Sequence, residues 1–172
     1  MKNRRTASSE GETLRIREMT LDDLPQVMAI EEVSFPTPWT AGLFIEEMGY
    51  PFCCDLVAYT GDALVGYISF AVILDEIHLR NIAVHPRRRR SGIATALMRV
   101  LMETGIRKRT KRVTMEARPS NAAALALYKK FGFVVEGIRP DYYGDTGEDA
   151  LILWADIVKM SAIISEAERA NA

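Results

Sequence analysis

Hydrophobic and polar residues follow two different periods in the N-terminal third of the chain. Residues 14–19 alternate apolar and charged side chains, which predicts a half-buried strand. Residues 24–30 repeat apolar side chains at helical spacing, and residues 40–48 predict a second helix. Residues 35–39 contain two prolines, which cannot lie inside a helix or a central strand. This segment is therefore predicted to be a loop.

The middle of the chain predicts three strands and one long helix. Residues 53–60 and 63–72 read as strands, and Gly61-Asp62 between them predicts the turn of a hairpin. A third strand over residues 76–85 ends at Pro86 and is followed by an arginine-rich loop. The apolar residues after this loop share one helical face, namely Ile93, Ala96, Leu97, Val100, Leu101 and Met102.

The last third of the chain continues the mixture of strands and helices. The expected elements are a strand at 111–118, a helix at 121–131, strands at 133–137 and 150–157, and a loop at 142–148. No linker or internal repeat interrupts the series. We therefore expect one α/β domain over residues 12–158, between a flexible polar leader at 1–11 and a weakly helical tail at 159–172.

Composition narrows the classes of protein to consider. The net charge of −1 gives no overall attraction to DNA or to an anionic membrane, and no apolar run approaches the roughly 20 residues that span a bilayer. The leader lacks the apolar core of a secretory signal. Cys53 and Cys54 are adjacent, a poor geometry for a disulfide, and no histidine or cysteine is spaced for a metal. A cytoplasmic protein with reduced cysteines and no metal is expected.

Residues 81–94 carry the first chemical signal, a strand, a loop with four arginines, a glycine and a helix. The N-terminus of a helix offers free N–H groups and a partial positive charge, which suit a pyrophosphate. Gly92 lets the backbone approach an anion, and the arginines of residues 87–90 add charge-assisted hydrogen bonds. The alternative is a solvated basic loop that contacts RNA. Dinucleotide and Walker motifs do not match this segment.

Two motifs resemble those of the GNAT superfamily of N-acetyltransferases. Arg89-x-x-Gly92-x-Ala94 is similar to its acetyl-CoA loop, and residues 116–133 resemble its later motif. The resemblance implies a GNAT fold of class α/β (α+β), with a mixed, mostly antiparallel twisted sheet of about six or seven strands and about four helices. The sheet would be splayed where acetyl-CoA binds. The implied contacts with acetyl-CoA are Ile82, Ala83, Val84, Arg89, Arg90, Ser91, Gly92, Ile93, Ala94, Thr95 and Asn121.

Three further segments resemble one group within this superfamily. Residues 34–39, 81–84 and 142–152 are similar to the bacterial RimI group, which acetylates the N-terminal alanine of ribosomal protein S18. The resemblance covers residues 14–157 and implies the same partner here. The alternatives are acetylation of a small amine, or a CoA-binding or RNA-binding module without catalysis. The arginine run could also contact ribosomal RNA weakly.

The resemblance implies that Glu116 is the general base and that Tyr128 protonates the departing thiolate. Alternation along residues 111–118 places Glu116 opposite the core-facing side chains, although a salt-bridged surface acid would show the same pattern. Tyr128 shares helical spacing with apolar residues and could equally be a core aromatic. Asn121 is either a helix cap or a CoA contact.

The chemistry of the amine supports an N-terminal substrate. An α-amine has a pKa of about 8, against about 10.4 for lysine, so a single glutamate suffices as its base. The backbone of residues 82–84 would pair with the pantetheine arm and polarise the thioester carbonyl. Aromatic residues and prolines from two loops could form the peptide slot or simply cover the core, namely Phe35, Pro38, Trp39, Tyr142 and Tyr143.

Overall fold

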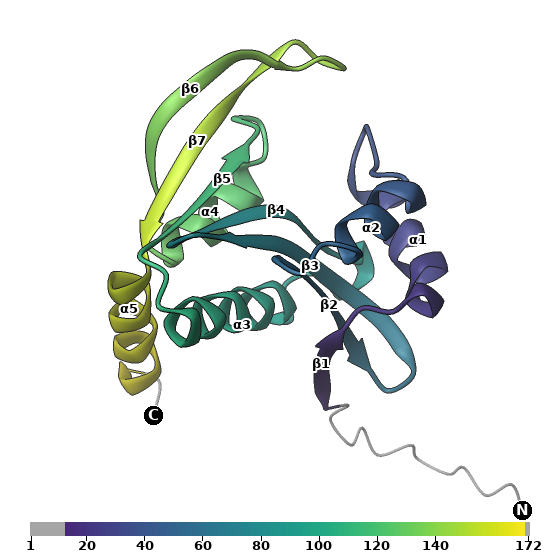
Figure 1. Ribbon diagram of the computed structural model, residues 1–172, viewed down its shortest axis with the longest axis horizontal. Helices are drawn as coiled ribbons and strands as arrows, with labels where there is room; N and C mark the ends of the chain where they lie inside the picture. Colours follow the sequence, from purple (N-terminus) through teal and green to yellow (C-terminus); the bar gives the residue numbers. More distant parts are fainter. Residues whose placement is uncertain (1–12, 171–172) are drawn as a thin grey trace, which may run out of the picture.

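A seven-stranded sheet forms the centre of the protein in the computed structural model, which describes residues 13–170 (Figure 1). The strands lie in the order β1-β2-β3-β4-β5-β7-β6. Their bounds are Leu14–Glu18, Cys53–Thr60, Ala63–Ile73, Glu76–Val84, Arg112–Ala117, Val134–Tyr143 and Glu148–Asp156 for β1 to β7. All neighbours pair antiparallel except β4 and β5, which are parallel. The mixed, mostly antiparallel sheet is confirmed, whereas the expected leader at 1–11 lies outside the described residues.

Helices cover both faces of the sheet. Their bounds are Leu24–Ser34, Ala41–Met48, Ile93–Lys108, Ala122–Lys130 and Ile157–Ala170 for α1 to α5, with short 3-10 turns at Leu21–Asp23 and Pro86–Arg88. Thr40 caps α2 by accepting the N–H of Leu43 at 3.2 Å. Helices α1 and α2 lie on one face, and α3 and α5 on the other (Figure 1). Among residues 13–170, no helix is long and apolar enough to cross a membrane.

Strand alternation divides the core into two layers. Tyr67 faces α1 and α2, whereas its neighbour Ile68 faces the layer that contains α3, and both side chains are completely buried. The same division separates Val57 from Ala58 on β2. Because successive side chains of a strand point to opposite faces, one central sheet supports both layers.

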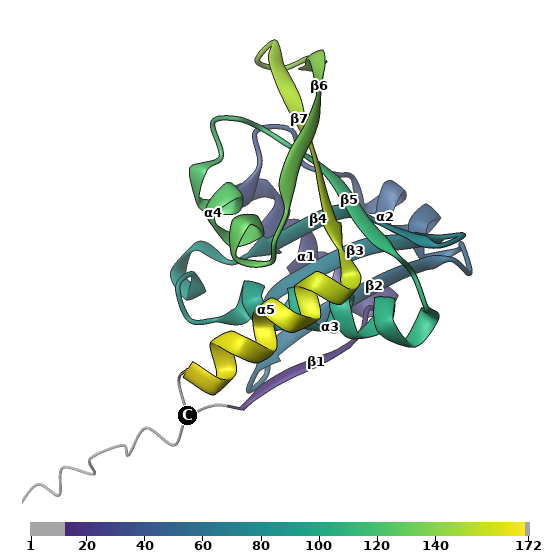
Figure 2. The same ribbon diagram turned by 90° about the vertical axis from the view of Figure 1, so that its left-hand side faces the viewer.

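The C-terminal segment differs from its expectation. Residues 159–170 of the predicted tail belong to α5, which starts at Ile157 and lies alongside α3 (Figure 2). Met160 is completely buried and Ile164 is 8% exposed, both in the layer with α3. The helix approaches α3 at Gly105, where an added Cβ would lie 2.5 Å from Cδ1 of Ile157. The proposed domain limit at 158 therefore falls inside a packed helix.

We expect Met160→Ala to lower the free energy of unfolding by about 2–5 kcal/mol, because it removes a fully buried side chain and leaves a cavity. Val158→Ala, on the same helix but 75% exposed, should change it by less than about 0.5 kcal/mol. Urea unfolding followed by circular dichroism measures both. Equal effects of the two variants would contradict a structural role of α5.

The β6–β7 hairpin is longer than the sequence predicts. Strand β6 reaches Tyr143 and β7 begins at Glu148, so most of the expected loop at 142–148 is strand or tight turn. The sequence pattern did not predict this extension of β6, because the strand contains Pro140 and proline usually ends a strand. It is tolerated here because β6 is an edge strand and the register shifts between Arg139 and Tyr143. The hairpin projects from the body of the protein (Figure 2).

Strands β4 and β5 separate after a short paired segment. The pairs are Glu76 with Arg112, Ile77 with Val113, and His78 with Thr114. Within the described part of the chain, no pairing joins the two strands beyond these residues, although β4 stays paired with β3 as far as Val84. The expected splay of the sheet is present, and it opens at the ends of β4 and β5 (Figure 1).

Candidate active site

A cleft of about 680 Å³ opens where β4 and β5 diverge. Residues 79–82 of β4 and 115–118 at the end of β5 line its floor. The α1–α2 loop forms one wall, and α4 with the β6–β7 loop forms the other. Of the predicted site residues, the cleft brings together Glu116, Tyr128, Ile82, Asn121, Phe35, Pro38, Trp39, Tyr142 and Tyr143.

Glu116 reaches the cleft from β5. Its neighbours Met115 and Ala117 are 4% and 6% exposed, whereas 32% of the Glu116 side chain remains exposed. The period of a strand explains this alternation. Oε1 of Glu116 lies 3.5 Å from Nη2 of Arg139 on β6, a distance that leaves the carboxylate open to a second partner. A side chain with these surroundings can accept a proton from a group in the cleft.

Tyr128 lines the same cleft from the buried face of α4. The residue is 5% exposed, and its ring packs against Phe133 with centroids 5.8 Å apart. Burial, with a smaller contribution from Tyr143, raises the pKa of Tyr128 well above its usual range. The ring is thus part of the core, as one interpretation predicted, and the residue also borders the cleft.

The arginine-rich loop and the start of α3 form a separate part of the site. Gly92 caps α3 with a φ of +81°, a left-handed conformation, and a Cβ added there would meet nothing within 4 Å. Glycine is therefore favoured by the backbone and not by lack of space. Gly92 has no side chain, so it cannot cap the free N–H groups in the first turn of α3. These include the N–H groups of Ile93, Ala94 and Thr95.

Local hydrogen bonds shape this loop. The side chain of Arg89 donates to the carbonyl of Val84 at 3.2 Å, and Ser91 donates to the carbonyl of Arg88. All four arginines of residues 87–90 are exposed, and Arg90 has a φ of +63°. Such a loop can bind a polyanion with its arginines and with the helix N-terminus. Among the described residues, none of residues 87–92 lines the cleft.

The remaining predicted acetyl-CoA contacts have mixed surroundings. Side chains of Ala83 and Val84 are 7% and 8% exposed and belong to the two core layers, so they offer only their backbone. Ile82 is partly exposed and borders the cleft. Asn121 caps α4, because its side chain accepts the N–H of Ala124 at 3.2 Å, and it also borders the cleft. The prediction of a cap is confirmed for Asn121.

The predicted substrate residues line the cleft from the α1–α2 loop and from the end of β6. Trp39 packs on Phe44 with centroids 5.2 Å apart, and Tyr142 and Tyr143 make an edge contact at 5.1 Å. Thr37 of the first loop donates to Oδ2 of Asp145 at 2.8 Å and so bridges the two walls. Burial raises the pKa of Tyr143 to about 12, so its phenol remains protonated at neutral pH.

Arg118 organises the β6–β7 loop, a role that the sequence did not reveal. Its guanidinium binds both oxygens of Asp145 at 2.8 and 2.9 Å, contacts Glu148 at 3.4 Å and lies 3.9 Å above the ring of Tyr143. The hydrogen bond from Arg118 lowers the pKa of Asp145, and Ser120 lowers that of Glu148. Both acids are thus engaged within the loop.

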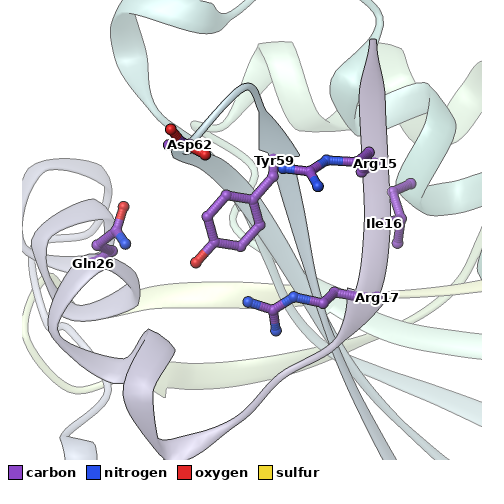
Figure 3. Close-up of a pocket in the computed structure, with 6 residues that line it drawn as sticks. All are labelled: Arg15, Ile16, Arg17, Gln26, Tyr59 and Asp62. Carbon is purple, nitrogen blue, oxygen red and sulfur yellow. The ribbon is translucent and has the colours of Figure 1, made fainter.

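A second hollow, between β1 and α1, has the features of a structural cluster. Figure 3 shows Arg15 and Arg17 projecting from β1 toward Tyr59, with Ile16 on the opposite side. Arg17 binds both oxygens of the buried Asp23, and the hydroxyl of Tyr59 donates to the same carboxylate at 2.7 Å. Arg17 therefore holds the pKa of Asp23 far below its usual range. These groups are engaged with one another.

Comparison with known proteins agrees with this arrangement. The family described as "Acetyltransferase (GNAT) family" matches residues 24–133, more than half of the chain. The crystal structure of the ribosomal-protein-S18-alanine N-acetyltransferase from Escherichia coli has a TM-score of 0.78 and 31% identity, covering 84% of this chain and 94% of that one. The protein therefore belongs to the acetyltransferase (GNAT) family.

Relatives within the family point to one group. The "[Ribosomal protein bS18]-alanine N-acetyltransferase" of Escherichia coli (strain K12) is 34% identical over 140 residues, which are 80% of this chain and 94% of the relative. A Bacillus subtilis (strain 168) protein provisionally given the same name is 39% identical over 143 residues, 83% of this chain and 95% of the relative. This chain is an N-acetyltransferase that resembles these enzymes.

Proposed function

We propose that the protein transfers the acetyl group of acetyl-CoA to the N-terminal alanine of ribosomal protein S18. One observation carries the proposal: Glu116 and Tyr128 line a single cleft at the point where the sheet splays. The similarity to the bS18-alanine N-acetyltransferases supports the choice of substrate.

Acetyl-CoA fits the surfaces beside the cleft. Its pyrophosphate suits the N-terminus of α3, where Gly92 provides the left-handed turn and Arg89 and Arg90 supply positive charge. Its extended arm suits the gap between β4 and β5, where the backbone at residues 82–84 can pair with it as an added strand. The thioester would then lie next to Ile82, and an N–H from this segment would polarise its carbonyl.

The peptide enters between the α1–α2 loop and the β6–β7 loop. Glu116 accepts the proton of the α-ammonium, directly or through a water, and so frees the nitrogen lone pair. The nitrogen attacks the thioester carbon and a C–N bond forms. The nitrogen then passes its excess proton to solvent, and the C–S bond breaks. Tyr128 donates its phenolic proton to the departing sulfur and is reprotonated from solvent.

The test is acetyl transfer to an alanine-initiated peptide with the N-terminal sequence of S18, followed by mass spectrometry. We expect one acetyl group on the α-nitrogen. The matched control is the same peptide with a blocked N-terminus and an added lysine. It should stay unmodified because a lysine amine, with a pKa of about 10.4, is much harder to deprotonate than an α-amine, with a pKa of about 8. Turnover of a small amine without transfer to the peptide would overturn the proposed substrate.

A further inference from the structure

Glu31, in the last turns of α1, is a completely buried acid that borders the active-site cleft. Its two oxygens have different partners. Oε2 accepts the backbone N–H of Trp39 at 2.7 Å, and Oε1 accepts Nδ2 of Asn81 at 2.8 Å. One carboxylate therefore connects the α1–α2 loop to strand β4.

The two partners belong to opposite functional parts of the cleft. Trp39 lies in the loop that forms the wall where the peptide enters. Asn81 is 9% exposed and directly precedes Ile82, where the thioester would lie. Rigid placement of the amine relative to the thioester matters, because small displacements of reacting atoms cost large factors in rate.

An acid in this position is costly unless it bonds to its surroundings. Burial raises the pKa of Glu31, whereas the hydrogen bonds from Trp39 and Asn81 oppose that rise. The other buried side chains of α1 that pack on the sheet are apolar. A buried carboxyl among them lowers stability unless its hydrogen bonds compensate for the lost contact with water. The next residue, Glu32, is also acidic but is exposed, so the presence of two successive acids does not explain why Glu31 is buried.

We propose that Glu31 is a positioning residue that joins the peptide-binding loop to β4, so that the amine and the thioester are held in one fixed geometry. The proposal rests on the proposed function for the identity of the two substrates. It assigns the effect to hydrogen bonding and not to negative charge. Glutamine can replace the acid, because its oxygen can accept from Trp39 and its amide can donate to the oxygen of a rotated Asn81.

Steady-state kinetics of Glu31→Met and Glu31→Gln test this proposal. Methionine has a similar volume but makes neither bond, so we expect kcat/KM for the S18 peptide to fall about tenfold or more. Glutamine should keep kcat/KM within about threefold of the native value. The affinity for CoA should stay within about twofold in both variants, since α3 and its loop are unchanged. Glu32→Met, one residue away and exposed, is the matched control.

The single variant Asn81→Ala keeps the proposal testable if Glu31→Met does not fold. Asn81→Ala removes one of the two bonds and should lower kcat/KM for the peptide several-fold with unchanged CoA affinity. Where Glu31→Met folds, adding Asn81→Ala to it should cost little more, because the two residues act as a unit.

Native-like peptide kinetics in Glu31→Met, or in Asn81→Ala where Glu31→Met does not fold, would overturn the inference. Equal losses in Glu31→Met and Glu31→Gln would also overturn it, because charge and not hydrogen bonding would then matter. Failure of the native protein to acetylate the S18 peptide would instead overturn the proposed function.

Discussion

Glu116→Gln is expected to lower kcat/KM for the S18 peptide by about 10³-fold at pH 7, within the range for loss of a general base. Glutamine has nearly the same shape, so it should occupy the same position on β5 but cannot accept the ammonium proton. Affinity for CoA should not change, because the loop and helix that suit its phosphates lie outside the cleft lining.

The pH dependence of this variant separates a base from a merely structural acid. An α-amine has a pKa of about 8, so its neutral fraction grows as the pH rises. The rate of the Glu116→Gln variant should therefore increase between pH 7 and pH 9, when solvent has already removed the proton. Rates measured over pH 6–9 with a fixed saturating concentration of acetyl-CoA show this trend directly.

Glu136→Gln is the matched control for Glu116→Gln. Glu136 also pairs with an arginine, Arg112, but it lies on the exposed part of β6 and does not line the cleft. Its replacement should leave kcat/KM within about twofold. If Glu116→Gln behaved like Glu136→Gln at every pH, the carboxylate of Glu116 would not be the base.

Local sequence patterns were sufficient for most of the sheet. Strands β2 and β3 and their turn were predicted because β-forming residues flank Gly61-Asp62, where Gly61 adopts a φ of +57°. Helix α3 followed from one apolar face, and the special role of Gly92 before it from the order of strand, loop, glycine and helix. These features depend on residues close together in the chain.

Features that depend on distant contacts were missed. Glu31 is buried because Asn81, 50 positions away, binds it, so sequence spacing on α1 could not distinguish it from the exposed Glu32. Arg118 similarly meets Asp145 only through the β6–β7 turn. Helix α5 was predicted to be a tail because its sequence does not indicate that Met160 packs in the core layer that contains α3.

Tyr128→Phe is expected to lower kcat by about 10²-fold, because it removes the proposed proton donor for the departing sulfur. The ring that packs against Phe133 remains, so the protein should stay folded, and CoA affinity should be close to the native value. Release of free thiol, followed with a chromogenic reagent at saturating peptide, measures kcat. The exposed Tyr50, whose hydroxyl donates to Glu46, provides the control variant Tyr50→Phe, which should leave kcat unchanged.

The proposed role of Tyr128 as the general acid also predicts the alkaline side of the pH profile, because its pKa is raised. Burial penalises the charged phenolate, so the hydroxyl stays protonated to a higher pH than an ordinary tyrosine, whose pKa is about 10. The useful form of a general acid is the protonated one, and it therefore persists throughout pH 7–10. The native kcat should show no fall in this interval attributable to Tyr128, and the ratio of native to Tyr128→Phe rates should stay constant.

A high phenol pKa is compatible with proton donation to a thiolate. A CoA thiol has a pKa similar to that of free cysteine, about 8.5 in water. The apolar surroundings that disfavour the phenolate also disfavour a thiolate in the same cleft, so both pKa values move upward together. The hydrogen bond from Tyr128 then acts as sulfur charge develops, when it stabilises the transition state most. A Tyr128→Phe variant with native kcat across pH 7–10 would show that solvent protonates the sulfur.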